Sequence, residues 1–211
     1  MTSAAGVAAN APEAITQLPP IGDRAWFDRS AAEVAPDLLG AVLIHDTPGG
    51  RIAGRIVEVE AYLGPEDLAA HSSHGHTARN KVMFGPPGHV YVYLVYGLHH
   101  CVNVVCGPGS KPEAVLLRAA ELTEGEELAR SRRGQVPSAR LASGPGNLAS
   151  AFGIDRRLDG VDLLAGPLRL QRGRRPEAIE RTARIGVDYA GAWADQPLRY
   201  LVRDDPHRSR R

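Results

Sequence analysis

The sequence predicts an α+β fold, in which a mainly antiparallel, curved sheet is flanked by a few helices and carries a protruding β-hairpin. Segments with the alternation or apolar content of strands are numerous, and helical patterns are few. Strands and helices also lack the regular alternation that builds a parallel sheet. A chain of 211 residues with no internal repeat and no linker-like segment is expected to form a single compact domain.

The predicted domain runs from residue 21 to residue 205. Residues 1–20 are rich in alanine and have neither a basic start nor the apolar core of a signal peptide, so we expect a disordered tail. Residues 206–211 form an arginine-rich C-terminal tail that either is solvated or adds non-specific affinity for nucleic acid. No segment approaches the roughly 18 apolar residues of a membrane span, and the prediction is a cytoplasmic protein that does not bind membranes.

The first predicted helix begins after Ser30. The segment Ser30-Ala31-Ala32-Glu33 has the pattern of a capping box, in which serine and glutamate side chains satisfy backbone N–H groups at a helix start. Gly40 suits the C-terminal cap. Pro36 falls inside this helix and predicts a kink there or a later start.

Two paired strands follow, at residues 41–44 and 51–62, with a turn at 47–50 between them. The polar segment 64–87 has little strand or helix pattern. A loop of that length inside a compact domain is usually functional or disordered.

Residues 89–106 predict a β-hairpin with Gly97 near its turn. Tyr91 and Tyr93 share one strand face, whereas Tyr96 is out of phase with them and is expected near the tip. Tyrosines often pack in cores, but three hydroxyl groups in six residues would each need a partner. An aromatic side chain at a hairpin tip is better suited to insertion into a base stack.

The later part of the chain has weaker patterns. Residues 114–118 are predicted to form a strand and residues 123–133 a charged helix, and two late strands are expected at 168–170 and 198–202. Gly144-Pro145-Gly146 precedes a helical run at 147–152, where free backbone N–H groups could bind a phosphate, although such turns are common.

The strand at 51–62 carries the first candidates for chemistry. Alternation places Glu58, Glu60 and Tyr62 on one face. This pattern is typical of a solvated outer face, but the strand leads directly into the long polar loop, where a site could form. The local pattern leaves both interpretations open.

The loop contains His71, His74 and His76, which could suggest a metal site. The sequence lacks the helical histidine pair or cysteine spacing of zinc sites, so one histidine that hydrogen-bonds a substrate is the favoured interpretation. A metal site is therefore not predicted from these histidines. Cys101 and Cys106, the only cysteines, are expected to be buried free thiols.

Charge is distributed unevenly along the chain. Residues 1–129 include 8 basic and 15 acidic residues, whereas residues 130–211 include 17 basic and 9 acidic ones. The basic residues of the second part are all arginines, which bind phosphates well. The alternative is an arginine-rich composition throughout, since Lys81 and Lys111 are the only lysines.

Taken together, these segments resemble the alkyladenine (3-methyladenine) DNA glycosylases, also called methylpurine-DNA glycosylases. The similarity covers residues 26–203 and keeps several motifs in order. The motifs are RIVEVEAYLGPED at 55–67, AAHS at 69–72, Arg79-Asn80, Met83-Phe84, Tyr91-Val92-Tyr93, Tyr96-Gly97, Asn103, VLLRA at 115–119, Gly144-Pro145-Gly146-Asn147-Leu148 and Gln196-Pro197-Leu198-Arg199-Tyr200.

The resemblance implies a monomeric DNA-repair enzyme without metal or cofactor, associated with the nucleoid if the protein is bacterial. Such an enzyme inserts a β-hairpin into the minor groove of double-stranded DNA and flips a damaged purine into a pocket. It then hydrolyses the N-glycosidic bond and so starts base-excision repair. The implied lesions are alkylated or deaminated purines of the 3-methyladenine, 7-methylguanine, hypoxanthine and ethenoadenine class.

The resemblance also implies roles for single residues. Glu60 would be the general base that activates water, and Arg118 would hold that water or the nearby backbone. The base pocket would be formed by Tyr62, His71, Tyr93 and Asn103. The DNA contacts would come from Tyr96, which would fill the vacated stack, and from Gly97, Arg79 and Asn147.

The chemistry of the implied substrate agrees with these residue types. An alkylated purine carries positive charge and leaves readily, so the main need is a carboxylate that activates water. Tyrosine faces favour a cationic ring by roughly 0.5–2 kcal/mol per contact. Neither Lys81 nor Lys111 lies near the implied site, so a monofunctional glycosylase without a lyase step is predicted.

Two other functions stay open at this stage: a non-catalytic module that binds damaged DNA, and an RNA-directed protein of related fold. Glu60 favours the enzyme. The sequence departs from the family pattern at His74 and His76 in the loop, at Leu98-His99-His100 where an aromatic residue is expected, and at Asn147 where lysine is common. These departures bear on DNA grip and lesion breadth.

Overall fold

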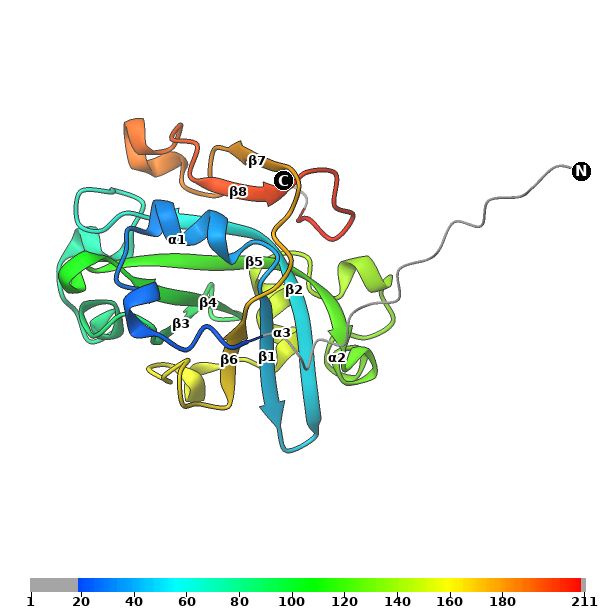
Figure 1. Cartoon of the computed structure of the whole chain (residues 1–211). Coiled ribbons are helices and arrows are strands. Elements are labelled where there is room, and N and C mark those ends of the chain that lie inside the picture. The colour runs from blue at the N-terminus through cyan, green and yellow to red at the C-terminus, as the bar shows by residue number, and fades with distance from the viewer. Residues whose placement is uncertain (1–18, 210–211) are drawn as a thin grey trace, which may run out of the picture.

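The long strand β2 (Gly50–Tyr62) organises the sheet (Figure 1). In the computed structural model, which describes residues 19–209, its first half pairs with β1 (Val42–Thr47). The opposite edge pairs with β5 (Glu113–Glu124) along most of its length. This central position explains why β2 can bring side chains from several strands together.

The remaining strands extend the sheet on both sides. The order is β3-β4-β5-β2-β1-β6, where β3 is Val90–Val95, β4 is His99–Cys106 and β6 is Leu168–Gln171. A further strand, β8 (Arg199–Val202), pairs with β2 at Glu58–Glu60 and also with β7 (Ile179–Thr182). Every pairing between these strands is antiparallel, and the predicted α+β class is confirmed.

The alternation of β2 is interrupted in its middle. The register with β5 shifts on both sides of Glu58, which pairs with Ala119 while Val59 pairs with Leu117. Both Glu58 and Glu60 are fully buried, at 0% exposure. A solvated outer face, one of the two sequence interpretations, is therefore wrong for these carboxylates.

Helix α1 (Ala31–Leu38) begins with the predicted capping box between Ser30 and Glu33. The alternative of a later start is wrong, since Pro36 lies inside the helix. The carbonyl of Ala32, which has no N–H partner at Pro36, accepts from the Tyr200 hydroxyl at 3.4 Å. Gly40 follows the helix with φ 86° and donates to Ile56 O of β2 at 2.9 Å, so it ties the helix end to the sheet.

Helices α2 (Glu126–Arg133) and α3 (Pro145–Phe152) follow β5. The predicted helix at 123–133 is wrong at its start, because Thr123 and Glu124 continue β5 and the left-handed Gly125 ends the strand. Helix α3 begins two residues earlier than predicted, with proline in its first turn. It packs on β4 and β5, and α2 packs on α3.

The core lies between the helices and the sheet. It joins Phe27 and the buried face of α1 to the inner residues of β2, β4 and β5, and includes Leu148 and Phe152 of α3. Figure 1 shows α1 across β2 and β5, where Val34 and Leu38 have 0% exposure. This packing fixes the strands from which the site is built.

The long polar loop has two short 3-10 turns, at His71–His74 and Lys81–Phe84. Asn80 holds it together: its Oδ1 accepts from the backbone and hydroxyl of Thr77 at 2.7 and 2.9 Å. Its amide Nδ2 donates to His71 O and Gly75 O, both at 2.9 Å. The loop is ordered by these contacts, so the interpretation as a disordered segment is wrong.

Further 3-10 turns join these elements, at Arg24–Trp26, Pro108–Ser110, Ser138–Arg140, Arg156–Leu158 and Asp188–Trp193. Within residues 19–209, no helix has the length and apolar content to cross a membrane.

Most of the expected N-terminal tail, residues 1–18, lies outside the described residues, as do residues 210–211 of the expected C-terminal tail. Pro20 forms a bridge with Gln171 of β6. Residues 206–209 return to the sheet, where the Ser209 backbone N–H donates to Glu58 at 2.6 Å. Their position brings the end of the chain beside the buried carboxylates of β2.

Candidate active site

A cavity of about 590 Å³ opens between the β3–β4 hairpin, the long loop and the segment 185–189. All the predicted site residues except Glu60 and Asn147 line it. The predicted site residues that line it are Tyr62, His71, Arg79, Tyr93, Tyr96, Gly97, Asn103 and Arg118.

One wall of the cavity is aromatic. Tyr91 and Tyr93 share a face of β3, as alternation predicts, and their rings stack with centroids 5.3 Å apart. The rings of His71 and Tyr93 pack edge to face with their centroids 4.4 Å apart, and His71 Nδ1 lies 2.9 Å from the Tyr91 hydroxyl. The wall therefore combines π faces with polar edges, which suits a flat heteroaromatic ligand.

Burial sets the protonation of this wall. It lowers the pKa of His71 to about 4, and the positive charge of Arg79 and the nearby His74 act in the same direction. His71 is thus neutral near pH 7, with one ring nitrogen as donor and the other as acceptor. Burial also raises the pKa of Tyr91 to about 12 and raises that of Tyr93 further, so both hydroxyls stay protonated donors.

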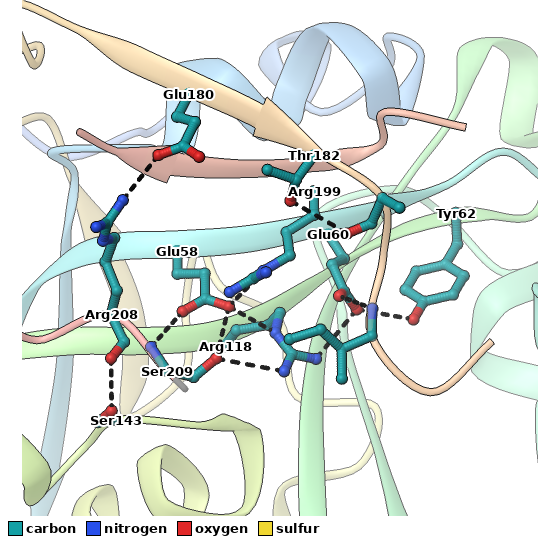
Figure 2. A network of polar contacts seen from close by, with 12 residues as sticks. Glu58, Glu60, Tyr62, Arg118, Ser143, Glu180, Thr182, Arg199, Arg208 and Ser209 are labelled. Atoms are coloured by element: carbon teal, nitrogen blue, oxygen red, sulfur yellow. Dashed lines mark hydrogen bonds and ion pairs between the residues drawn. The ribbon is translucent and has the colours of Figure 1, made fainter. Parts of the chain in front are cut away.

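Glu60 lies behind Tyr62 and Arg118 (Figure 2). Its Oε2 accepts from the Tyr62 hydroxyl at 3.0 Å and from Arg118 Nη1 at 3.2 Å, and its Oε1 accepts from Ile185 N at 2.8 Å. Burial and the charge of Glu60 raise the pKa of Tyr62 well above its usual value, so this hydroxyl is a permanent donor. The carboxylate is one hydrogen bond away from three cavity-lining residues.

Glu58 is the second carboxylate of this network. Its Oε1 accepts from Arg118 Nε and Arg199 Nε, both at 2.8 Å, and from the Ser209 hydroxyl at 2.7 Å (Figure 2). Burial opposes its ionisation, but Arg118, the Ser209 N–H and Arg199 outweigh that effect and lower the pKa of Glu58. The two carboxylates and two guanidinium groups balance in charge within a buried cluster.

The hairpin tip projects beside the cavity. Tyr96 is 92% exposed and has φ 51°, a left-handed conformation that is rare for a bulky residue. The neighbouring Leu98 is 77% exposed. Because exposed apolar side chains contribute nothing to the core, this tip has the character of a contact surface.

The methylpurine-DNA glycosylase (MPG) family model matches residues 25–206. The chain belongs to the methylpurine-DNA glycosylase family. Relatives from Streptomyces avermitilis and Methanocella arvoryzae are 50% and 49% identical over 189 and 197 residues. These matches span 87% and 91% of this chain, and 88% and 97% of the relatives. A third relative, from Methanoculleus marisnigri, is 48% identical over 89% of this chain and 97% of its own length. All three carry the name "Putative 3-methyladenine DNA glycosylase".

Membership of this family makes the protein a DNA glycosylase, a hydrolase that acts on N-glycosyl bonds in DNA repair. DNA is accordingly its substrate. The resemblance stated from the sequence motifs is confirmed.

Arg79 and Asn147, two of the residues predicted to contact DNA, lie in different surroundings in this glycosylase. Arg79 lies over the Tyr93 ring, with its guanidinium 5.3 Å from the ring centre, and donates to Leu94 O at 3.0 Å. Asn147 donates from Nδ2 to Ser143 O at 2.7 Å in the first turn of α3, and it does not line the cavity. Asn103 does line it and donates to Tyr91 O at 3.1 Å.

Sequence reasoning missed several groups of the glycosylase site. Asp67 and Arg184 form an ion pair with 0% exposure on both sides, and the Arg184 guanidinium lies 4.7 Å from the centre of the Tyr62 ring. Tyr189, which is 70% exposed, adds an aromatic side chain to the cavity lining. Asp67 lies inside the motif at 55–67 and could have been noticed there, whereas nothing local marks Arg184.

The described residues 19–209 contain no cluster of three or more His, Cys, Asp or Glu that could hold a metal ion. His76 packs against Phe84 at 5.0 Å, and His74 lies 3.2 Å from the Ser73 hydroxyl. Cys101 and Cys106 are buried free thiols, as predicted.

Proposed function

We propose that this glycosylase flips alkylated or deaminated purines out of duplex DNA into the cavity and hydrolyses their N-glycosidic bond, starting base-excision repair. The proposed lesions are 3-methyladenine, which the relatives' names specify, together with 7-methylguanine, hypoxanthine and ethenoadenine. One observation carries the proposal: a cavity with an aromatic wall whose lining side chains Tyr62 and Arg118 both contact a buried carboxylate, Glu60.

Glu60 is the proposed general base. Glu58 is the less suitable carboxylate, because two guanidinium groups and both donors of Ser209 bind it and its pKa is lowered. Glu60 shares only Arg118 with that cluster and lies beside Tyr62 at the cavity lining. Glu60 is 0% exposed and does not line the cavity, so the proposal requires the lining groups that contact it, Tyr62, Arg118 and Ile185, to shift when substrate binds.

The aromatic wall supports selection of damaged bases. A cationic alkylpurine gains roughly 0.5–2 kcal/mol on each electron-rich tyrosine face relative to a neutral purine. A neutral His71 leaves the cavity without an imidazolium charge that would repel such a cation. We propose that the flipped base is contacted by Tyr62, His71, Tyr93 and Asn103, because all four side chains line this cavity.

Tyr96 is the proposed wedge. Its exposed ring at the hairpin tip can enter the stack that a flipped nucleotide leaves, and Gly97 beside it has φ 70° and open space around it. Flipping costs a few kcal/mol, least at weakened base pairs, so a wedge helps damaged pairs most. Arg79 and Asn147 remain proposed contacts to the DNA around this tip.

The proposed reaction has no lyase step, and the proposed active species is a monomer. Lys81 and Lys111, the two lysines of the chain, do not line the cavity. Lys111 Nζ pairs with Glu66 and Glu113, each at 3.2 Å. Among the described residues, no lysine amine therefore lines the cavity, where a Schiff base with the sugar would form.

The test compares wild type with Glu60→Gln in single-turnover excision from duplexes that each carry one lesion. We expect the variant to lose about 10²- to 10⁴-fold in rate, as for loss of a general base, while lesion affinity stays. Glu121→Gln is the matched control. The Glu121 carboxylate lies 2.7 Å from Arg55 Nε and does not line the cavity, so we expect an unchanged excision rate.

Each alternative predicts a different outcome. Wild type that binds lesion DNA without releasing a base would support the non-catalytic module. Equal affinity for damaged duplex and single-stranded RNA would support the RNA-directed protein. Excision by Glu60→Gln at the wild-type rate would reject Glu60 as the base while leaving the glycosylase activity in place.

A further inference from the structure

The C-terminal segment reaches the carboxylate network behind the cavity. Ser209 contacts Glu58 twice, through its N–H at 2.6 Å and its hydroxyl at 2.7 Å (Figure 2). The same hydroxyl oxygen accepts from Arg118 Nη2 at 3.4 Å. One side chain near the end of the chain thus bridges a buried carboxylate and a cavity-lining guanidinium.

We propose that Ser209 is a positioning residue for catalysis, which sets the orientation of Arg118 directly and through Glu58 and so aligns Arg118 with Glu60. This inference rests on the proposed function, in which Glu60 is the base and Arg118 acts beside it.

The geometry of Arg118 supports the proposal. Its guanidinium donates from Nε to Glu58, from Nη1 to Glu60 and from Nη2 to Ser209. A planar group held at three corners has one allowed orientation. Loss of the hydroxyl removes the third contact and one of the donors that fix Glu58, so the guanidinium can rotate away from Glu60.

Because the network is buried, the alignment of Arg118 is sensitive to the loss of one hydrogen bond. The Arg118 and Arg199 side chains are 7% and 5% exposed, and those of Glu58 and Glu60 are 0% exposed. Hydrogen bonds to charged groups in buried surroundings are stronger than those in water, and each depends on its neighbours. A small misalignment at Glu58 is therefore transmitted to the opposite carboxylate.

A purely structural role, in which Ser209 only fastens the C-terminal segment, is less consistent with the contacts. Other groups already hold that segment: Ser143 donates to Arg208 O at 2.9 Å, Arg208 pairs with Glu180 at 2.8 Å, and Asp205 pairs with Arg55 at 2.6 Å. The Ser209 hydroxyl instead hydrogen-bonds Glu58 and Arg118.

The experiment compares Ser209→Ala, Ser209→Thr and Ser143→Ala in the full chain, at saturating enzyme and at a temperature where circular dichroism shows all variants folded. We expect Ser209→Ala to lower the single-turnover excision rate by about 10- to 150-fold, the effect of one hydrogen bond to a charged group, with lesion affinity within about twofold of wild type. Ser209→Thr keeps a hydroxyl and should restore most of the rate.

Ser143→Ala is the matched control, because it makes the same substitution and removes an anchor of the same segment without contacting Glu58 or Arg118. We expect its excision rate to equal that of wild type. Equal slowing by Ser143→Ala and Ser209→Ala would overturn the proposal in favour of simple anchoring, as would a wild-type rate for Ser209→Ala.

A double-mutant cycle with Glu58→Gln tests the route of the effect. If Ser209 and Glu58 act on Arg118 as one unit, adding Ser209→Ala to Glu58→Gln should slow excision by less than Ser209→Ala slows it alone. Independent, fully multiplied effects would overturn the proposed route. Wild type without any excision would instead contradict the proposed function itself, so the two failures are distinguishable.

Discussion

Replacing Asp67 with alanine should destabilise the protein strongly. Asp67 Oδ1 accepts from Arg184 Nη2 at 2.9 Å and from Ala69 N at 3.0 Å, and Oδ2 accepts from Leu63 N at 3.1 Å and from Arg184 Nη1. Both charged side chains are 0% exposed. The substitution leaves a buried guanidinium without its carboxylate and two backbone N–H groups without their acceptor.

The expected magnitude follows from that burial. Removing one partner of a buried ion pair costs about 3–5 kcal/mol, because the remaining charge stays desolvated. For a domain of this size, each kcal/mol lowers the melting temperature by roughly 2–4 °C, so Asp67→Ala should melt about 6–20 °C below wild type. Excision should fall as well, since Arg184 precedes Ile185, whose N–H donates to Glu60 at 2.8 Å.

Urea unfolding, monitored by circular dichroism, measures the change in the free energy of unfolding. Glu177→Ala is the control, because Arg174 and Glu177 form an ion pair with side chains 83% and 88% exposed, and its loss should cost less than about 1 kcal/mol. The double variant Asp67→Ala/Arg184→Met should be more stable than Asp67→Ala alone, since it removes the uncompensated charge. A loss below about 1 kcal/mol for Asp67→Ala would refute the reasoning.

Two further predictions concern the hairpin and the aromatic wall. Tyr96→Ser should weaken binding to lesion DNA by roughly 5- to 150-fold, the value of one stacked base, without lowering the melting temperature because Tyr96 is 92% exposed; unchanged affinity would count against the wedge. His71, with its pKa lowered to about 4 by burial, should show no NMR titration between about pH 5 and about pH 8, and an inflection near pH 6.5 would contradict its burial. Since the unfolded histidine titrates near pH 6.5, His71 should make the fold less stable as pH falls from about 6.5 toward about 4, by at most about 1.4 kcal/mol per pH unit in urea unfolding.

Strands of this protein could be predicted well because their signal is local. Alternation and turn residues marked β1, β2 and the β3–β4 hairpin, and each forms close to the expected residues. The boundary error at Thr123 and Glu124 has a different origin. The helix-compatible sequence is overridden by the pairing of Leu122 with Gly54 and of Glu124 with Ala53 of β2, which no local pattern reports.

The strand β7 was missed for a related reason. Ile179–Thr182 is short, half-buried and rich in polar side chains, and its pairing with β8 stabilises it. A four-residue strand of this kind has too few apolar positions to show a period. Its existence depends on a partner that is itself placed by β2.

The candidate site could be predicted in part. Motif positions identified the side chains that line the cavity, and the structure brings them together. The groups that support them were not predictable from spacing, because Ile185, Arg184 and Ser209 lie 125, 117 and 151 residues from the carboxylates they contact. Contacts at such separations arise only when the last strands and the C-terminal segment fold onto β2.

Glu58 and Glu60 show how such distant contacts decide chemistry. The two carboxylates lie on the same strand, share Arg118 and have the same 0% exposure, so alternation alone makes them equivalent. Their difference comes from later parts of the chain. Arg199 and Ser209 donate hydrogen bonds to Glu58. Glu60 instead accepts from the Ile185 N–H and from the hydroxyl of Tyr62, which lines the cavity. A carboxylate bound by two guanidinium groups is a weaker base than one bound by a single guanidinium, because each cation stabilises its charged form. The proposed division into one base and one positioning carboxylate is therefore a property of the folded chain, imposed on two glutamates by residues more than a hundred positions away.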